Sequence, residues 1–311
     1  MNLLRRLYRA LLGAGVRLLE SAGLNVARAS DYYSPLPSRR ELAETRTRWD
    51  RPSQMIGVEY DLDEMQVRAS KLVSAYYAEY SRLPPYADVK QMGFGPGFTV
   101  HDGMWLYLML RHLKPARYIE IGSGISTWYA VQAAQANAGD GRPCDLLAID
   151  PYSSAEVRAL PGVEVLPEPV QSVPMSRFEE LRAGDVLFID STHVVKIDGD
   201  VPHLYLEVLP RLATGVNVHA HDIHFPYNVP HPAEQYVFRS KWPLFWTEAM
   251  LLQAFLAFNR EFEIVLSPPM LRHYDEEFLR RTVPDYRPVE VADHDTHSGS
   301  IWLRRVLSLG G

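Results

Sequence analysis

Carboxylates follow short apolar runs at four places in the sequence. Glu120, Asp150, Asp190 and Asp222 each stand at the end of such a run or directly after it. In an open α/β sheet, ligands bind outside the carboxyl ends of the strands, where these side chains would meet. Acids are also common caps of the helices that follow strands, so each one alone has a purely structural explanation. Their regular recurrence favours a ligand site at one edge of a sheet.

The first run leads into a Gly-x-Gly turn, Glu120-Ile-Gly-Ser-Gly124. Gly122 and the glycine that ends the motif would let the backbone approach a ligand with no Cβ in the way. The acid offers an acceptor, which suits an ammonium group or a ribose hydroxyl. The third glycine of a dinucleotide fingerprint is absent from this motif. The motif therefore predicts a nucleoside without a pyrophosphate, with Asp150 on the ribose diol.

A second group of polar residues follows the later strand-like runs. Two carboxylates and an imidazole at adjacent strand ends suit Mg²⁺, Mn²⁺ or Fe²⁺, and we expect Asp190, His221 and Asp222 to hold such a cation. His193, three residues past Asp190, is the predicted general base, because the pKa of an imidazole lies near neutrality. The alternative for His193 is a surface or capping histidine.

Other histidines surround the same strand end, in the pattern His219-x-His-x-x-His224. A dinuclear hydrolase could use such a set. His219 would lie one strand step inside the sheet, so we expect a hydrogen-bonded residue of the core there. His224 and His231 fall in the following loop and are expected near an acceptor.

Recognition of a base and of an acceptor is harder to predict. Gln171 or Ser172, after the third strand-like run, could face an adenine or solvent. Five aromatic residues could form a wall over an acceptor, although packing is an alternative role for each: Tyr32, Tyr33, Trp242, Phe245 and Trp246.

In these motifs the chain resembles the class I S-adenosylmethionine-dependent methyltransferases, over roughly residues 102–305. The matching segments are Glu120-Ile-Gly-Ser-Gly124, Ile149-Asp150, Phe188-Ile-Asp190 and His221-Asp222. The resemblance implies that metal-dependent O-methyltransferases of this class place acidic ligands at the ends of the fourth and fifth strands. At the end of the fifth strand this chain has His221 before its acid. The resemblance implies S-adenosylmethionine as cofactor, bound by Glu120, Gly122, Ser123, Gly124, Asp150 and Asp190.

The alternation of strand and helix patterns predicts a Rossmann-like, doubly wound α/β sheet of seven strands. An antiparallel last strand is what the resemblance implies for this fold. Strands are expected near residues 117–121, 145–149, 163–166, 185–189, 215–220, 262–267 and 298–305. Helices are expected near 61–80, 102–112 with Asp102 as its cap, 126–137, 154–160, 176–182, 200–212 and 245–259.

The chain divides by pattern into two parts. We expect a helical N-terminal extension and lid over residues 1–98 and a cofactor-binding domain over 99–311, with a long loop insertion near 223–243. Residues 1–22 form a basic amphipathic pattern, interrupted too often for a membrane span. Such a helix lies on a membrane surface, or packs on its own domain or in a homodimer. The glycine-rich residues 93–98 are a hinge, a cofactor lid or a plain linker.

Composition bounds the partners and the compartment. Hydrophobic residues make up 47% of the chain and charged residues 23%, as in ordinary globular proteins. A net charge of -6 argues against a nucleic-acid partner. The single cysteine, Cys144, excludes an intrachain disulfide and a multi-cysteine zinc site. We expect a cytoplasmic protein.

The leading hypothesis is O-methylation of a hydroxylated small-molecule or glycan acceptor, with S-adenosylmethionine as donor. A metal-dependent hydrolase or hydroxylase-like enzyme on the same sheet is one alternative, and it predicts activity without that donor. A non-catalytic binding or assembly protein is another, and it predicts a partner lost on removal of residues 1–22.

Overall fold

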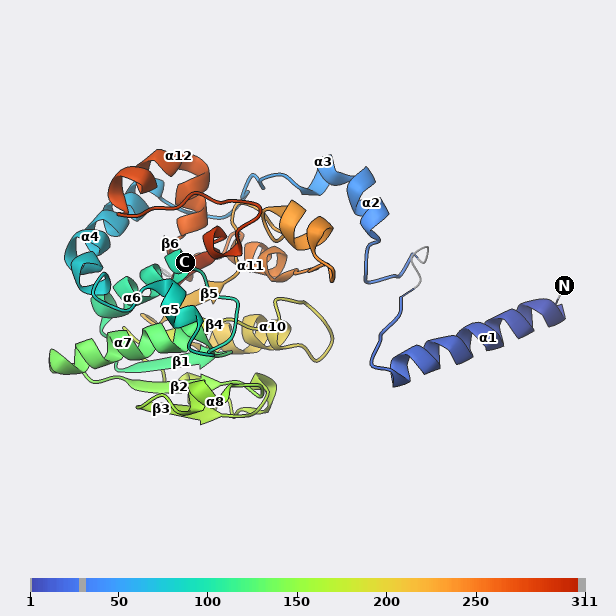
Figure 1. Cartoon of the computed structure of the whole chain (residues 1–311), viewed down its shortest axis with the longest axis horizontal. Helices are drawn as coiled ribbons and strands as arrows, with labels where there is room; N and C mark the ends of the chain where they lie inside the picture. The colour runs from blue at the N-terminus through green and yellow to red at the C-terminus, as the bar shows by residue number, and fades with distance from the viewer. Residues whose placement is uncertain (1, 28–31, 307–311) are drawn as a thin grey trace. The chain divides into compact units, whose positions relative to one another are not determined.

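A mixed seven-stranded sheet lies at the centre of residues 50–311 (Figure 1). The computed structural model describes residues 2–27 and 32–306 of the chain. The strand order is β3-β2-β1-β4-β5-β7-β6, and β7 runs antiparallel to both of its neighbours. This arrangement confirms the predicted fold class. The strands are β1 (Arg117–Ile121), β2 (Asp145–Ile149), β3 (Val163–Leu166), β4 (Val186–Ile189), β5 (Asn217–His221), β6 (Phe262–Leu266) and β7 (Ser300–Arg305).

Helices and short helical segments connect and cover these strands. The α-helices are α1 (Asn2–Ser21), α2 (Arg39–Glu44), α3 (Arg46–Trp49), α4 (Leu62–Tyr80), α5 (Tyr86–Lys90), α6 (Val100–Leu113), α7 (Ile125–Gly139), α8 (Ala155–Arg158), α9 (Ser176–Glu179), α10 (Asp200–His203), α11 (Glu248–Leu256) and α12 (Pro268–Thr282). The 3₁₀ segments are η1 (Val170–Ser172), η3 (Leu209–Arg211) and η5 (His294–Thr296). The π-helical segments are η2 (Leu204–Val208) and η4 (Glu234–Arg239).

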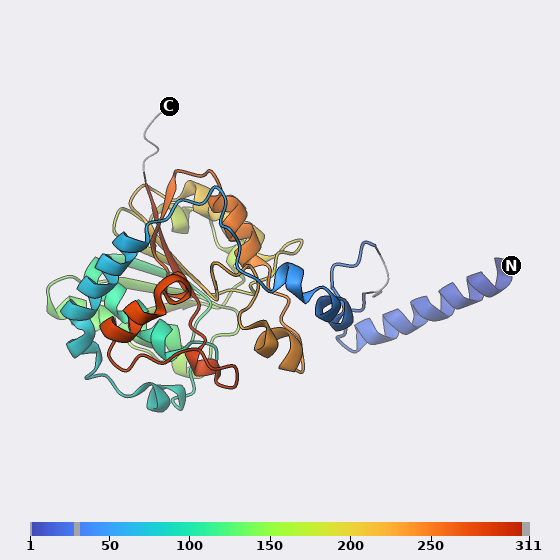
Figure 2. The same cartoon turned by 90° about the horizontal axis from the view of Figure 1, so that it is seen from above.

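Helices cover both faces of the sheet (Figure 2). On one face α7 packs on α6, α6 on α4, and α4 on α12. On the other face η2 contacts α10 and α11. The central strands β4 and β5 are buried along their whole length, as parallel strands covered on both sides must be. β4 accordingly appears in the sequence as a continuous apolar run, whereas β5 buries the polar residues Asn217, His219 and His221 between Val218 and Ala220.

The register of the parallel strands aligns their carboxyl ends. Ile121 pairs with Ile149 on one side and with Ile189 on the other, and Ile189 pairs with Ala220. The residues that follow β1, β2, β4 and β5 therefore emerge at the same edge of the sheet. The edge is where the four predicted carboxylates were expected to meet.

The start of α6 differs from the predicted one. Thr99, not Asp102, is the N-cap: its side-chain oxygen accepts the backbone N–H of Asp102 at 3.2 Å. Asp102 itself is completely buried. The capping prediction was wrong because a threonine three residues earlier satisfies the orphan donor, which leaves the carboxylate free to point into the interior.

Two compact units are distinguished, residues 1–49 and residues 50–311. In the first, α1 matches the predicted basic helix, and Ser38 and Glu41 form a capping box at the start of α2. In the second, α4 to β7 belong to the same unit as the sheet. A domain boundary near residue 98 stays a prediction. No helix among the described residues has both the length and the apolar character needed to cross a bilayer.

Candidate active site

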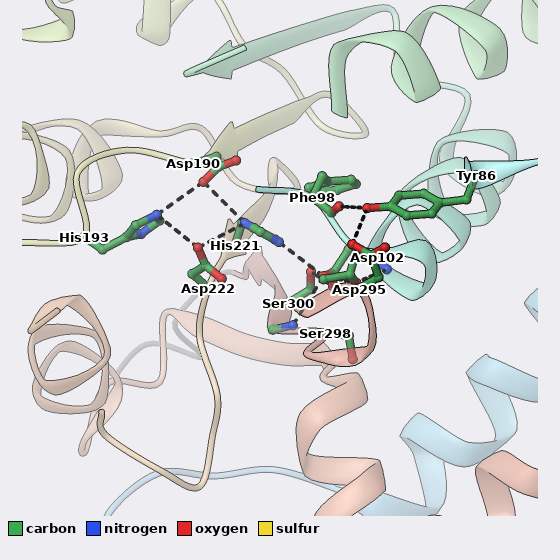
Figure 3. Close-up of polar contacts among 12 residues, drawn as sticks. Tyr86, Phe98, Asp102, Asp190, His193, His221, Asp222, Asp295, Ser298 and Ser300 are labelled. Carbon is green, nitrogen blue, oxygen red and sulfur yellow. Dashed lines mark hydrogen bonds and ion pairs between the residues drawn. The ribbon is translucent and has the colours of Figure 1, made fainter. Parts of the chain in front are cut away.

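A cavity of about 910 Å³ opens at the carboxyl ends of β1, β2, β4 and β5. Gly122 and Asp150 line one part of it, and Asp190, His193 and Asp222 line another. The loop over residues 96–98, within the glycine-rich stretch, also borders the cavity. Tyr86 anchors that loop by donating its hydroxyl to the carbonyl of Phe98 at 2.6 Å (Figure 3). The cavity thus gathers residues from distant parts of the sequence.

The glycine turn is built around one position. Gly122 has φ +86°, in the left-handed region, and a Cβ there would overlap the carbonyl oxygen of Asp190. Its N–H donates to the carbonyl of Ile149 at 3.0 Å, which ties the turn to β2. The turn can therefore pass beside the cavity only with glycine at this position.

Asp150 lies at the cavity wall directly after β2. Its Oδ2 accepts the hydroxyl of Ser123 at 2.5 Å, and its Oδ1 accepts the backbone N–H of Tyr152 at 2.7 Å. Each carboxylate oxygen has a second lone pair for a ligand hydroxyl. Ser123 and Tyr152 also line the cavity. The arrangement fits the predicted ribose-binding role.

Two of the predicted cofactor residues do not line the cavity. Glu120 is fully buried, and one of its oxygens accepts the hydroxyl of Ser126 while the other has no partner among the described residues. Gly124 is the residue before α7, and its N–H donates to the side chain of Thr127 at 2.9 Å. Glu120 and Gly124 therefore support the turn without lining the cavity. Direct contact with a cofactor stays a prediction for them.

Asp190, His193 and Asp222 converge at the other part of the cavity (Figure 3). Each offers one ligand atom, and these atoms lie within 4.8 Å of one another. Nε2 of His193 is 3.3 Å from Oδ1 of Asp190 and 3.3 Å from Oδ2 of Asp222. His193 and Asp222 both have positive φ values, 59° and 56°, which non-glycine residues rarely adopt. The local backbone conformation aims these side chains inward.

His221 is held between carboxylates on both sides of its ring (Figure 3). Nδ1 is 3.3 Å from Asp190 and 3.6 Å from Asp222, and Nε2 is 3.2 Å from Oδ2 of Asp102. Ser300 donates its hydroxyl to the other oxygen of Asp102 at 2.7 Å. Asp102 is therefore a part of this network that sequence patterns did not identify, because an acid in the first turn of a helix ordinarily indicates capping.

A second residue that the sequence did not identify is Glu248, the first residue of α11. Its Oε2 lies 2.7 Å from Nδ1 of His193. A glutamate at a helix start resembles an ordinary charge that complements the helix dipole. Its position in the sequence, 55 residues after His193, gives no sign of the contact.

Comparisons with known proteins bear on the same residues. Residues 119–223 match the model of a protein family described as a methyltransferase domain. This stretch runs from β1 to just past β5 and includes the glycine turn and the later acids. The chain carries a class I S-adenosylmethionine-dependent methyltransferase domain. The comparisons support neither the hydrolase nor the assembly alternative.

Other similar proteins have low identity. An uncharacterized protein from Archaeoglobus fulgidus is 27% identical over 163 residues, covering 48% of this chain and 71% of that one. The O-methyltransferase from Bacillus cereus, solved with S-adenosylhomocysteine, is 11% identical with a TM-score of 0.42, covering 79% of this chain and 100% of that one. The O-methyltransferase TomG from Streptomyces achromogenes, solved with S-adenosylmethionine, is 14% identical with a TM-score of 0.40, covering 80% and 92%.

The electrostatics of the methyltransferase site are dominated by buried carboxylates. Burial opposes a charged imidazole, but Asp190, Glu248 and Asp222 together raise the pKa of His193 to about 10. Burial raises the pKa of Asp222 to about 6, although His221 and His193 oppose this shift. Burial would also raise the pKa of Asp102, yet hydrogen bonds from His221, Thr99 and Ser300 bring it down to about 2. The site therefore attracts positive charge.

Of the remaining predicted residues, some lie in the core and some line the cavity, whereas Ser172 and Trp242 are exposed and do not line it. His219 is fully buried and stacks on Trp302 with ring centroids 4.2 Å apart, so its place in the core is confirmed; hydrogen-bond partners for its ring nitrogens are absent among the described residues. Gln171 and Trp246 line the cavity. His224 is buried behind it, against the ring of Tyr236.

Proposed function

We propose that the methyltransferase transfers the methyl group of S-adenosylmethionine to a hydroxyl group of a small-molecule acceptor. The observation that carries this proposal is that one cavity borders both the Gly122–Asp150 region and the cluster of Asp190, His193 and Asp222. A nucleoside bound at the first part would place a sulfonium near the second. Alignment of a hydroxyl with that methyl group supplies much of the rate in such a transfer.

The cofactor is proposed to lie along the turn after β1, with its ribose at Asp150. Ser123 fixes the rotamer of that carboxylate, and Gly122 leaves room beside it. Gln171 lines the same part of the cavity and is a candidate contact for the adenine. Asp190 lies where this part meets the acceptor end.

A divalent cation is proposed at the acceptor end, bound by Asp190, His193 and Asp222. Two carboxylate oxygens and an imidazole nitrogen within 4.8 Å of one another suit Mg²⁺, Mn²⁺ or Fe²⁺. Such a cation would lower the pKa of an acceptor hydroxyl and favour its attack as an oxyanion. His221, with carboxylates at both ring nitrogens, is proposed to orient Asp190 and Asp222.

His193 has two proposed roles that use the same atom, Nε2. As a general base it would take the proton of the acceptor hydroxyl. As a ligand it would hold the cation. The surrounding carboxylates favour the second role, because they raise its pKa to about 10 and a protonated Nε2 cannot accept a proton. A cation would replace that proton and relieve the same negative charge.

The acceptor end of the cavity has aromatic walls. Trp246 lies beside His193, with ring centroids 4.6 Å apart, and Tyr236 lies 5.5 Å from Trp246. His297 also lines the cavity, with its ring centroid 5.5 Å from that of Tyr236. These flat faces support a ring-shaped acceptor that carries a hydroxyl group, whether phenolic or glycosidic.

The test is methyl transfer from radiolabelled S-adenosylmethionine to a panel of catechols, phenols, glycosides and amines, with mass spectrometry of the products. We expect O-methylated product that is lost with EDTA and restored by Mn²⁺ or Mg²⁺. His193→Ala should lower turnover about 100-fold or more, whereas His112→Ala, an exposed change on α6, should leave it unchanged. Product formation that survives both EDTA and His193→Ala would contradict the proposed roles, and methylation confined to amines would contradict O-methylation.

A further inference from the structure

The N-terminal turn of α11 is hydrogen-bonded to the backbone of the loop that carries His193. The backbone N–H groups of Thr247 and Glu248 donate to the carbonyl of His193 at 2.8 and 3.1 Å. The N–H of Val195 donates to the hydroxyl of Thr247 at 2.8 Å. These bonds hold His193 in its left-handed backbone conformation, which would otherwise be unfavourable for a residue with a Cβ.

The same turn also holds the imidazole ring. Oε2 of Glu248 lies 2.7 Å from Nδ1 of His193, and the Glu248 side chain is almost completely buried. The other oxygen of Glu248 accepts the hydroxyl of Tyr205 at 2.8 Å. Tyr205 is itself buried, on η2. The carboxylate therefore has both oxygens engaged and one fixed orientation.

We assign the direction of this bond from the usual roles of the two groups, with Nδ1 of His193 as the donor and the carboxylate of Glu248 as the acceptor. The proton on Nδ1 leaves Nε2 as the nitrogen that faces the cavity, between Asp190 and Asp222. Without an acceptor at Nδ1, only the contacts of Nε2 with Asp190 and Asp222 would orient the ring.

We propose that Glu248 is the positioning residue of His193, which keeps the proton on Nδ1 and aims Nε2 at the cavity. The inference rests on the proposed function in one respect, namely that Nε2 of His193 is the nitrogen that works in catalysis. Tyr205 supports Glu248 by fixing its second oxygen. Histidines that bind metals are generally oriented by a carboxylate or carbonyl at the other ring nitrogen, and loss of that partner costs about 10- to 100-fold in affinity or activity.

The first experiment detects the proton itself. Protein labelled with ¹⁵N-histidine is compared with its His193→Ala variant, so that the ring signals of His193 are assigned by their loss. We expect a slowly exchanging, hydrogen-bonded Nδ1–H in the wild type and in the control Glu207→Gln, an exposed change on η2. Glu248→Leu should lose this signal. An unchanged Nδ1–H signal in Glu248→Leu would overturn the proposal.

The second experiment measures the consequence, with Mn²⁺ alone as the probe. Calorimetric titration should give about 10- to 100-fold weaker Mn²⁺ binding for Glu248→Leu than for the wild type and for Glu207→Gln. Glu248→Gln, which keeps the size of the side chain, serves if the leucine variant does not fold, and it should also weaken binding. Equal affinity in a folded Glu248 variant would count against the proposal.

The two readouts separate this proposal from the proposed function. A wild-type protein that binds no Mn²⁺ but shows the Nδ1–H signal would contradict the cation site and leave the positioning role supported by the loss of the signal in Glu248→Leu. When an acceptor is available, Glu248→Leu should lower kcat and leave KM for S-adenosylmethionine within about twofold, because Glu248 does not line the cavity.

Discussion

Two imidazoles share four carboxylates at the centre of this site. His193 lies among Glu248, Asp190 and Asp222, and His221 lies among Asp190, Asp222 and Asp102. The carboxylates outnumber the imidazoles, so the group remains negatively charged even with both rings protonated. Charge of this sign, enclosed by protein, is what a divalent cation would neutralise. At the scale of single residues, the same carboxylates would therefore both bind the cation and orient the imidazole rings.

Glu120 presents a different case at the residue scale, because it is buried without a charged partner. Burial raises its pKa to about 8, and one oxygen has no partner among the described residues. Below a pH of about 4.5 both the folded and the unfolded chains carry the proton. Between that value and about 8 the unfolded chain loses it while the folded chain keeps it. The free energy of unfolding should therefore fall with rising pH across this window.

Glu120→Gln should remove that dependence. We expect the free energy of unfolding of the variant, relative to the wild type, to rise by up to about 1.4 kcal/mol per pH unit between pH 5 and 8. Urea unfolding at several pH values measures it. Parallel curves for the two proteins would show that Glu120 is ionised in the folded protein.

Residue types predicted part of the site. Asp150, Asp190 and Asp222 reach the cavity because each directly follows a parallel strand and has little freedom in where it emerges. His193 also reaches the cavity, from the loop after β4. Asp102 and Glu248 were not predicted, because their contacts depend on the packing of α6 and α11 against the sheet edge. Local patterns carry no information on such packing.

At the scale of elements, the close approach of α6 and α7 depends on one small residue. Gly103 lies in the first turn of α6, and a Cβ there would collide with the ring of Tyr129 on α7. The approach matters for function because α6 carries Asp102 and α7 follows the glycine turn. Gly103 has an ordinary helical backbone conformation. It is therefore needed because it has no side chain to collide with α7, and not because of its backbone freedom.

Gly103→Ala should therefore destabilise the fold by about 1–3 kcal/mol, the usual cost of excess volume in a packed core. Gly139→Ala is the matched control, since Gly139 is the last residue of α7 and a Cβ there would lie in open space. The control should be neutral or stabilising by up to about 1 kcal/mol. Chemical denaturation of both variants measures the difference, and equal stabilities would contradict the packing account.

Element prediction succeeded where periodicity was strong. The seven strands fall within a few residues of their predicted positions. The helix expected over 200–212 is instead a chain of α, π and 3₁₀ segments, a change of hydrogen-bond pattern that side-chain periodicity does not show. α12 was not predicted, although Pro268 and Pro269 at its start are well placed, because they lack donors that a helix start leaves unpaired anyway.

At the scale of the whole molecule, every residue that lines the cavity belongs to residues 50–311. Peripheral membrane contact or a homodimer through residues 1–22 stays a prediction, as does a cytoplasmic location. The amphipathic pattern predicted this helix correctly, since α1 spans Asn2–Ser21. Such a pattern does not identify the surface against which the apolar face of the helix packs.

The central claim is that the cavity holds S-adenosylmethionine with its ribose at Asp150. Calorimetric titration with S-adenosylhomocysteine tests it most directly, in the wild type, in Asp150→Asn and in Asp145→Asn, an exposed change at the opposite end of β2. We expect the wild type and Asp145→Asn to bind equally, and Asp150→Asn to bind about 10- to 100-fold more weakly, as expected when hydrogen bonds to a charged group are lost. Equal binding by Asp150→Asn, or no binding by the wild type, would contradict the account.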